Sequence, residues 1–387
     1  MKNLKFMIVA GEASGDRHGA ALVEALRNAG PGVNFEFFGA AGKRLRSAGV
    51  EPVVESDALS IVGLPEIARA LPIFLRAFRN LKRAAIERRP DAVILVDFPD
   101  FNLKLAKSLK KQGVKVIYYI SPQLWAWRKY RVNSIKKYVD LMIVILPFEK
   151  DWYADNGVTH VEYVGNPLAM EVHATTSKED FCRKYNLNVD RPIVSLLPGS
   201  RHKEIVRILP VMLGASALIS ARQPEIQFII ATASSRDERD VQEAIAAVKK
   251  DGSDPPIIVE NETYDALNAS DAAAITSGTA TLEAGIIGTP MAIVYNSSAL
   301  NYVLLKPLIS VDHYGLINLI AGERVAKELI QKDFTAETLA DEIIRLLEPA
   351  ENASMRERLK QAADKLGHGG ASKRAAEAII RLAKEHL

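Results

Sequence analysis

The sequence predicts an α/β fold of two consecutive, doubly wound, Rossmann-like domains with parallel sheets and a ligand cleft between them. Short, almost continuously apolar runs alternate with longer amphipathic segments, as in strands that are buried on both faces and separated by helices. This alternation starts again near residue 192. We expect a first domain over 1–170, a second over 171–345, and a helical tail over 346–387 that packs on the first domain or on a partner.

Composition sets the outer limits. With 387 residues, 48% hydrophobic and 25% charged, the chain can form two ordinary cores. The one cysteine, Cys182, excludes an internal disulfide and favours a reducing, cytoplasmic compartment. We expect no membrane-spanning run and no signal peptide. A net charge of +3 is too small to indicate nucleic acid binding.

The elements follow in order along the chain. In the first half, strands are predicted at 4–10, 35–39, 92–97, 115–120, 141–146 and 161–165, with helices such as 18–30 and 102–113 that end on glycine. In the second half, a strand from 192 and a long helix near 202–222 precede strands at 226–233, 256–260, 272–277 and 291–295. From about 325, beginning with "AKELIQ", the pattern is mostly helical. Ligands of such sheets bind at the carboxyl ends of the strands, so the loops there hold the candidate sites.

The motif "GEASGD" follows the first predicted strand. It is not the G-x-G-x-x-G fingerprint, which disfavours a nicotinamide cofactor. Glu12 would repel a pyrophosphate, so it suits sugar hydroxyls or a place near the reaction centre. We assign Ser14 and Gly15 to sugar binding. The alternative is a tight turn in which Ser14 and Asp16 cap the next helix.

The motif "DFPDFN" ends the strand at 92–97 and places two carboxylates, Asp97 and Asp100, at its carboxyl end. Either could act as a general base on a hydroxyl nucleophile. The alternative for both is helix capping, for which Asp100 is well placed.

The motif "SPQLWAWRKYR" follows the next strand. Trp127 and Arg128 could stack on a sugar ring or hold a phosphate. The alternative is that the tryptophans of this motif are buried packing residues.

Two loops of the second half are suited to phosphate. "LLPGSR" and "TSGTATLE" each run from a strand into a helix, where open N–H groups bind anions. Arginine grips phosphate with two hydrogen bonds, and a glutamate one helical turn further on could accept from ribose hydroxyls. Two such loops favour a nucleotide diphosphate, although each could be a plain capped turn. The residues concerned are Gly199, Ser200, Arg201, Ser277, Gly278, Thr279 and Glu283.

The segment 64–90 is both basic and amphipathic. Such a segment can rest on an anionic membrane or bind an acylated, phosphorylated ligand, although ordinary core packing is the alternative. The candidate contacts are Ile73, Phe74, Leu75, Phe78, Arg76 and Arg79.

Two kinds of chemistry lack support. The seven histidines form no His-x-x-x-His motif and there is no cysteine pair, so we expect no metal site. No Gly-x-Ser-x-Gly elbow is present, so we expect no nucleophilic triad.

Together the motifs "GEASGD", "DFPDFN", "SPQLWAWR", "PFEK", "LLPGSR", "SGTATLE" and "INLIAG" resemble, in this order, those of bacterial lipid-A-disaccharide synthases. The resemblance extends from residue 5 to beyond 330 and implies the GT-B glycosyltransferase fold. It also implies transfer of 2,3-diacylglucosamine from UDP-2,3-diacylglucosamine to the 6-hydroxyl of 2,3-diacylglucosamine 1-phosphate (lipid X). The products are a β-1,6-linked disaccharide 1-phosphate and UDP. The reaction inverts the configuration and uses no metal or cofactor, and the enzyme associates peripherally with the cytoplasmic face of the inner membrane.

The resemblance also implies roles for single residues. Asp97 matches the candidate base that deprotonates the acceptor hydroxyl, whereas Glu12 and Ser14 match the first glycine-rich loop. The choice between Asp97 and Asp100 stays open. We include Glu12 among the catalytic candidates.

On the donor side, Arg201 matches the arginine at the UDP phosphates and the 277–279 loop matches the second phosphate loop. Glu283 matches the ribose-binding glutamate and Asn318 the asparagine near the donor. Two positions depart from the family pattern. Asn166 stands where the family often has histidine, and the family's Pro-Asn-Leu reads "INL" here.

Three rival readings remain. Another two-domain enzyme of UDP-sugars, such as a UDP-N-acetylglucosamine 2-epimerase or a different transferase, is the nearest. A protein that binds a nucleotide sugar without turnover is the second, and a dehydrogenase, which lacks the fingerprint glycines, is the third. A homodimer, with or without exchange of the tail helices, is also open.

Overall fold

The computed structural model describes residues 2–56, 67–232, 235–248, 256–297 and 311–384. The chain forms two compact units. The first combines residues 1–167 with 369–387, and the second comprises 168–368. The segment expected as a separate tail, 346–387, is therefore divided between the two units.

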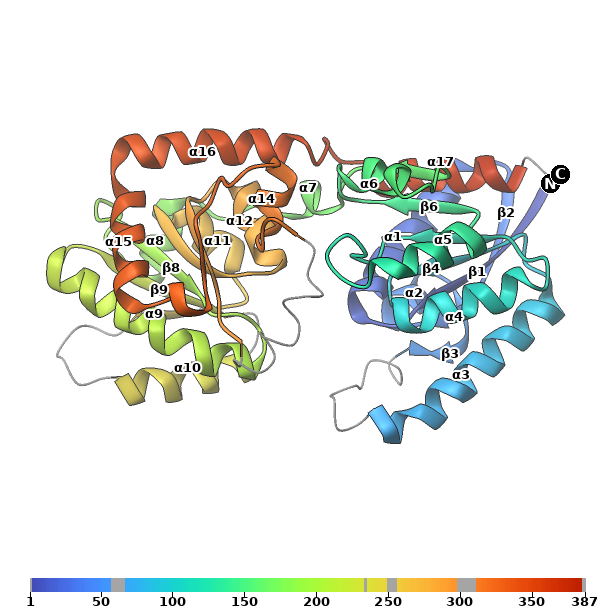
Figure 1. Cartoon of the computed structure of the whole chain (residues 1–387), viewed down its shortest axis with the longest axis horizontal. Helices are drawn as coiled ribbons and strands as arrows, with labels where there is room; N and C mark the ends of the chain where they lie inside the picture. Colours follow the sequence, from blue (N-terminus) through green and yellow to red (C-terminus); the bar gives the residue numbers. More distant parts are fainter. Residues whose placement is uncertain (1, 57–66, 233–234, 249–255, 298–310, 385–387) are drawn as a thin grey trace. The chain divides into compact units, whose positions relative to one another are not determined.

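A seven-stranded parallel sheet in the order β3-β2-β1-β4-β5-β6-β7 is the framework of the first unit (Figure 1). The chain runs outward from β1 to β3 and then returns to the other side of β1 with β4. The strand order thus reverses between β1 and β4, and their carboxyl ends lie next to each other. The strands are β1 (Lys2–Ala10), β2 (Val33–Ala41), β3 (Glu51–Glu55), β4 (Ala92–Val96), β5 (Val116–Tyr119), β6 (Leu141–Val144) and β7 (Val161–Tyr163).

Helices cover both faces of this sheet. Phe6 and Ile8 of β1 join one core with α1 and α17, whereas Met7 and Val9 join the opposite core with α3, α4 and α5. Helix α17 packs beside α1 and buries Ile379 completely (Figure 1). The helices are α1 (Ala13–Ala29), α2 (Lys43–Ser47), α3 (Ile67–Arg88), α4 (Pro99–Lys110), α5 (Val132–Tyr138), α6 (Glu149–Asp155) and α17 (Ala371–Lys384), with a 3-10 turn η2 (Lys129–Arg131).

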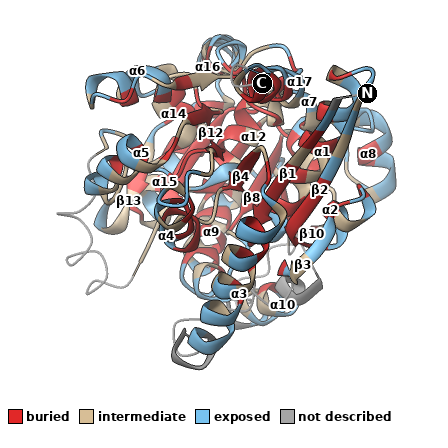
Figure 2. Ribbon diagram, turned by 90° about the vertical axis from the view of Figure 1, so that its right-hand side faces the viewer, coloured by how far each residue is buried: buried red, intermediate tan, exposed pale blue. Residues whose placement is uncertain are grey.

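The second unit repeats this plan with six parallel strands in the order β10-β9-β8-β11-β12-β13. Its order reverses between β8 and β11. Its strands β8, β9, β11 and β12 are almost wholly buried. Across the molecule, Figure 2 shows buried residues gathered in the strands and exposed residues on the outer sides of the helices. The strands are β8 (Ile193–Leu197), β9 (Gln227–Thr232), β10 (Ile257–Glu260), β11 (Ala272–Thr276), β12 (Met291–Tyr295) and β13 (Glu328–Ile330). The helices are α7 (Leu168–Glu171), α8 (Lys178–Tyr185), α9 (His202–Arg222), α10 (Ser235–Val248), α11 (Thr263–Ala269), α12 (Thr279–Ile287), α14 (Leu316–Ala321), α15 (Ala336–Leu347) and α16 (Pro349–Asp364), with η4 (Gln331–Asp333).

The predicted fold class is confirmed, but two edge strands were not foreseen. β3 contains Pro52 and is largely exposed, so it carries neither the apolar run nor the composition of a central strand. β13 lies within "AKELIQ", which the pattern predicted as helix, and that prediction is wrong. Three residues are too few to show a period of two, and pairing with β12 decides their conformation.

Helix α9 bears on the expectation that the chain has no membrane-spanning run. Of the described helices, it alone is long and apolar enough by length and composition. Its apolar residues Ile205, Ile208 and Leu209 are nevertheless fully buried, and the helix packs against α10 and α15. A core helix passes the same test, and α9 has the packing of one.

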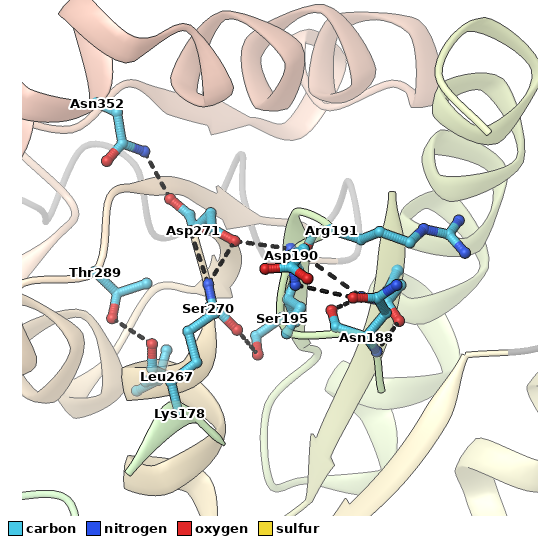
Figure 3. Close-up of polar contacts among 12 residues, drawn as sticks. Lys178, Asn188, Asp190, Arg191, Ser195, Leu267, Ser270, Asp271, Thr289 and Asn352 are labelled. Carbon is cyan, nitrogen blue, oxygen red and sulfur yellow. Dashed lines mark hydrogen bonds and ion pairs between the residues drawn. The ribbon is translucent and has the colours of Figure 1, made fainter. Parts of the chain in front are cut away.

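A polar network joins several elements at the amino ends of β8 and β11 (Figure 3). The Asp271 carboxylate accepts from the Ile193 backbone N–H at 2.9 Å and from Lys178 Nζ at 3.1 Å. Asn352 of α16 donates to the Asp271 carbonyl at 2.7 Å. These bonds lie at the end of the sheet opposite to the strand ends where ligands bind, so we assign them a structural role.

Candidate active site

The loops after β1 and β4 pack against each other at the reversal of strand order in the first unit. Phe98, which has a left-handed backbone (φ 51°), places its ring beside Gly11. A Cβ atom on Gly11 would lie 2.3 Å from Phe98 Cδ1. Gly11 is therefore required by the neighbouring loop. Gly15 differs, because a Cβ there would lie 3.6 Å from its nearest neighbours and would fit.

Asp97 directly follows β4 and also has a left-handed backbone, with φ 46°. Its carbonyl accepts from Tyr118 Oη at 2.6 Å and from Asn102 Nδ2 at 2.7 Å. Its N–H donates to the Tyr119 carbonyl at 3.1 Å. Because the Tyr118 and Asn102 side chains are fully buried, these bonds fix the Asp97 peptide and hence the start of its side chain.

The surroundings of Asp97 make it a better base. Burial, and secondly the negative charge of Glu12, raise the pKa of Asp97 to about 6, against a smaller lowering by the Phe98 N–H. Glu12 is exposed at the N-cap of α1. A carboxylate with this pKa is ionised at neutral pH and yet basic enough for general-base catalysis.

Asp100 has a different environment. Its side chain is exposed and forms ion pairs with Arg128, at 3.0 Å, and with Arg131. Arg128 also lies over the Trp127 ring, 4.4 Å from its centroid. Asp100 therefore anchors the loop that carries Trp127 and Arg128, and the geometry favours Asp97 as the base.

The rest of the "GEASGD" and "SPQLWAWR" motifs divides into exposed and structural residues. Ser14 is exposed in the first turn of α1. Asp16 is buried and accepts from the backbone N–H groups of Gly42, Arg44 and Leu45 at 2.8–3.2 Å. It caps α2, so the alternative in which Asp16 caps α1 is wrong. Trp125 is buried as the packing alternative predicted, with Nε1 3.2 Å from Glu149 Oε1.

In the second unit, the loops after β8 and β11 line a cavity of about 370 Å³ at the other reversal of strand order. Gly199 has φ 102°, and a Cβ there would lie 2.6 Å from Glu204 Oε2, so this turn requires glycine. The lining residues are Leu197, Gly199, Ser200, Arg201, Glu204, Ala231, Thr263, Thr276, Ser277, Gly278, Thr279, Ala280 and Glu283. The seven phosphate and ribose candidates of this unit are thus brought together.

Their individual settings differ. Arg201 is the N-cap residue of α9, and its exposed guanidinium contacts Glu204 at 2.9 Å. Ser277 donates its N–H to the Val294 carbonyl and its hydroxyl to the Tyr314 carbonyl, at 2.8 and 2.7 Å. Ser277 thus supports the loop. In the first turn of α12 the Thr281 N–H donates to the Gly278 carbonyl at 3.2 Å, whereas the N–H groups of Thr279 and Ala280 precede the first bond of the helix and can face an anion.

Two further candidates differ in their relation to the cavity. Glu283 lines it one turn into α12, where Tyr264 Oη donates to its Oε1 at 3.0 Å. Asn318 is fully buried and does not line it. Its amide bonds to the backbone of Ala326 at 2.8 and 2.9 Å and to Glu328 at 2.9 Å. These bonds favour a positioning role for Asn318 over direct contact with the donor.

The amphipathic segment is described from residue 67, as helix α3; residues 64–66 lie outside the described residues. Phe74 and Phe78 turn inward, with ring centroids 6.1 Å from Phe98 and 6.0 Å from Phe101. These two side chains therefore pack in the core, as the alternative of ordinary core packing predicted.

The opposite side of α3 is exposed. Leu71 and Leu75 lie on one flank of it and Ile73 on the other, each about half exposed, with Arg76 and Arg79 between the two flanks. Large apolar side chains so exposed, beside arginines, suit an anionic lipid surface.

Sequence reasoning gave no role to Asn102 or Tyr118. The position of Asn102 at the end of the motif "DFPDFN" could have indicated a role for it in the loop. Nothing in the sequence distinguishes Tyr118 from any other residue of a buried strand. No cluster of three or more metal-ligating side chains occurs in the part of the chain that the structure describes.

Comparison with known proteins identifies the family. A family model described as lipid-A-disaccharide synthetase matches residues 6–382. The lipid-A-disaccharide synthase of Syntrophus aciditrophicus is 45% identical over 388 aligned residues, covering 100% of this chain and 99% of the relative. That of Trichlorobacter lovleyi is 44% identical, covering 98% of each. The chain therefore belongs to the lipid-A-disaccharide synthase family.

Solved structures support the fold. A putative UDP-N-acetylglucosamine 2-epimerase from Listeria monocytogenes superposes with a TM-score of 0.68 at 16% identity, covering 99% of this chain and 97% of that one. At such identity the likeness shows the fold alone, which is the GT-B arrangement of two Rossmann-like domains.

The contact between Gly11 and Phe98 leads to a prediction for stability. We expect Gly11→Ala to lower the free energy of unfolding by about 1–3 kcal/mol, because the new methyl group must displace an aromatic ring. Gly15→Ala is the matched control and should change it by less than about 0.5 kcal/mol. Chemical denaturation of the three proteins measures the difference. Equal stability of both variants would contradict the contact.

Proposed function

We propose that this member of the lipid-A-disaccharide synthase family transfers 2,3-diacylglucosamine from UDP-2,3-diacylglucosamine to the 6-hydroxyl of lipid X. The products are a β-1,6-linked disaccharide 1-phosphate and UDP. The observation that carries the proposal is 45% identity to a synthase over the whole chain. The cavity of the second unit, lined by two loops suited to phosphate, supports it independently.

We assign the second unit to the UDP part of the donor. Arg201 and the first turns of α9 and α12 are placed to bind the diphosphate. As the glycosidic bond breaks, negative charge develops on the departing phosphate oxygen. The arginine and the helix N-termini would stabilise that charge, so the proposed reaction needs no metal or cofactor. Glu283 would accept hydrogen bonds from the ribose hydroxyls.

We assign the first unit to the acceptor. Asp97 would take the proton of the 6-hydroxyl as its oxygen attacks the anomeric carbon on the face opposite to UDP, which inverts the configuration. The raised pKa of Asp97, about 6, supports this role. Ser14, Trp127 and Arg128 are placed on neighbouring loops and could bind the acceptor sugar and its phosphate.

We further propose that the enzyme is cytoplasmic and associates peripherally with the inner membrane through α3. Leu71, Ile73 and Leu75 are 46–54% exposed, and arginines lie beside them. Both substrates carry acyl chains, so a lipid surface near the acceptor unit would supply them.

The nearest alternative is an epimerase of UDP-N-acetylglucosamine, because proteins named so share this fold. Two observations favour the synthase. The full-length relatives at 45% and 44% identity are synthases, whereas the epimerase is 16% identical. The exposed apolar residues of α3, Leu71, Ile73 and Leu75, suit the acylated substrates of a synthase, whereas an epimerase of UDP-N-acetylglucosamine needs no lipid surface.

The test is a direct assay with UDP-2,3-diacylglucosamine and lipid X in detergent micelles with a chelator, in which disaccharide is followed by mass spectrometry. We expect disaccharide only when both substrates are present, with the chelator having no effect. UDP release from UDP-N-acetylglucosamine without disaccharide would instead support an epimerase or a hydrolase.

The assignment of the base is tested by replacing each carboxylate in turn. We expect Asp97→Asn to lower turnover by about a hundredfold or more while UDP affinity is kept, because the base is lost and the second unit is untouched. Asp100→Asn should cost far less, since it breaks an exposed ion pair. Steady-state kinetics and UDP calorimetry give both numbers. The reverse ranking would assign the base to Asp100.

The pKa of Asp97 predicts a pH dependence. Below about pH 6 the base is protonated, so kcat/KM should fall tenfold per pH unit. Because the charge of Glu12 raises the pKa of Asp97, Glu12→Gln should lower that pKa and shift the acidic fall of kcat/KM, the acid limb of the pH profile, to lower pH. Glu24→Gln, an exposed change elsewhere on α1, should not. If neither variant moves the limb, a substrate phosphate or another group causes it.

The membrane proposal predicts a loss of vesicle binding. We expect Ile73→Ser combined with Leu75→Ser to weaken binding to anionic phospholipid vesicles at least about tenfold, because two apolar side chains no longer enter the lipid. Val189→Ser, which removes a similarly exposed apolar side chain from the second unit, is the control. Cosedimentation measures both. Unchanged binding of the double variant would exclude these two exposed flanks of α3 as the membrane contact.

A further inference from the structure

The loop that precedes α14 braces the cavity of the second unit. Ser277 Oγ, at the lip of the cavity, donates to the Tyr314 carbonyl at 2.7 Å. Two residues on, the Leu316 N–H donates at 3.2 Å to Thr281 Oγ1, which itself donates to the Gly278 carbonyl at 2.8 Å. The backbone of residues 314–316 thus holds both the loop after β11 and the first turn of α12.

The backbone of residues 314–316, called the brace below, is held in turn by the carboxylate of Glu328 on the edge strand β13. Glu328 accepts from the Tyr314 N–H at 3.0 Å, from the Gly315 N–H at 2.9 Å and from Asn318 Nδ2 at 2.9 Å. Pairing with Ile293 of β12 fixes the position of Glu328 in the sheet. A negative charge here also satisfies N–H groups at the start of α14, whose N-cap, Gly315, offers no side chain.

The packing leaves the brace little freedom. A Cβ on Gly315 would lie 2.3 Å from Ile293 Cδ1, so the backbone lies directly on β12. Asn318 adds a second tie, because its amide bonds to Glu328 and to both backbone groups of Ala326. The chain of contacts from the carboxylate to the phosphate loop is therefore continuous.

We propose that Glu328 is a positioning residue for binding of the nucleoside diphosphate, acting through the 314–316 backbone on Ser277 and Thr281. The inference rests on the proposed UDP site and adds a residue that does not line it. Loss of the carboxylate charge weakens three hydrogen bonds at once and lets the phosphate loop move. UDP then has to pay for ordering that loop, so its affinity falls.

The experiment measures UDP affinity by calorimetry for wild type, Glu328→Gln and Glu323→Gln. Glu323 is the matched control, since it precedes β13 by a few residues and its side chain forms an exposed ion pair with Arg358. We expect Kd to rise about tenfold for Glu328→Gln and to stay within about twofold for the control. In the transferase assay, KM should rise for the donor and not for lipid X, which a general loss of stability would not produce.

A double-mutant cycle tests the route. If Glu328 acts through Ser277, the combination of Glu328→Gln with Ser277→Ala should weaken UDP binding no more than the larger single change. Additive losses, or a folded Glu328→Gln protein with normal UDP affinity, would overturn the proposal. A wild-type chain that binds no UDP would instead remove the proposed function.

Hydrogen exchange on the wild-type protein covers the case in which Glu328→Gln does not fold. Coupling is reciprocal, so UDP should slow amide exchange at residues 314–316 as well as in the first turn of α12. Slowing that is confined to α12 would overturn the proposal.

Discussion

The reversal of strand order within each parallel sheet is the constraint on which the candidate sites depend. In the first unit, the chain leaves β1 toward α1 on one face and leaves β4 toward α4 on the other, as the two separate cores show. The backbone must diverge between these strands, and the space so opened receives polar side chains. The second unit repeats the arrangement at β8 and β11, where the cavity lies.

In the first unit, one group of aromatic rings connects the base to the exposed helix. Phe98, next to Asp97, has its ring centroid 5.7 Å from that of Phe101 and 6.1 Å from that of Phe74 on α3. The same ring excludes a side chain at Gly11. These apolar contacts contribute to the burial that raises the pKa of Asp97. Helix α3 therefore cannot shift far without changing the surroundings of the base.

The sequence predicted most strands and the loops of both sites, because periodicity and composition report how one element is buried. Periodicity and composition do not show which residues, far apart in the sequence, contact each other in the fold. Asp97 and Asp100 look equivalent in "DFPDFN", and only the structure separates a half-buried carboxyl from one paired with Arg128. Asp16 caps a helix that begins nearly thirty residues further on. The edge strands β3 and β13 were missed because sheet pairing, rather than local pattern, creates them.

Both sites share one way of fixing their loops. The first residue of each loop still bonds to a neighbouring strand through its N–H, to Tyr119 and to Val294, but the groups beyond it need other partners. Here side chains on regular elements provide them. Tyr118 on β5 and Asn102 on α4 hold the Asp97 peptide, whereas Glu328 on β13 holds the brace of the phosphate loop. Because these side chains are themselves anchored in a sheet or a helix, they transfer its rigidity to loops that would otherwise move, which is what a preorganised site requires.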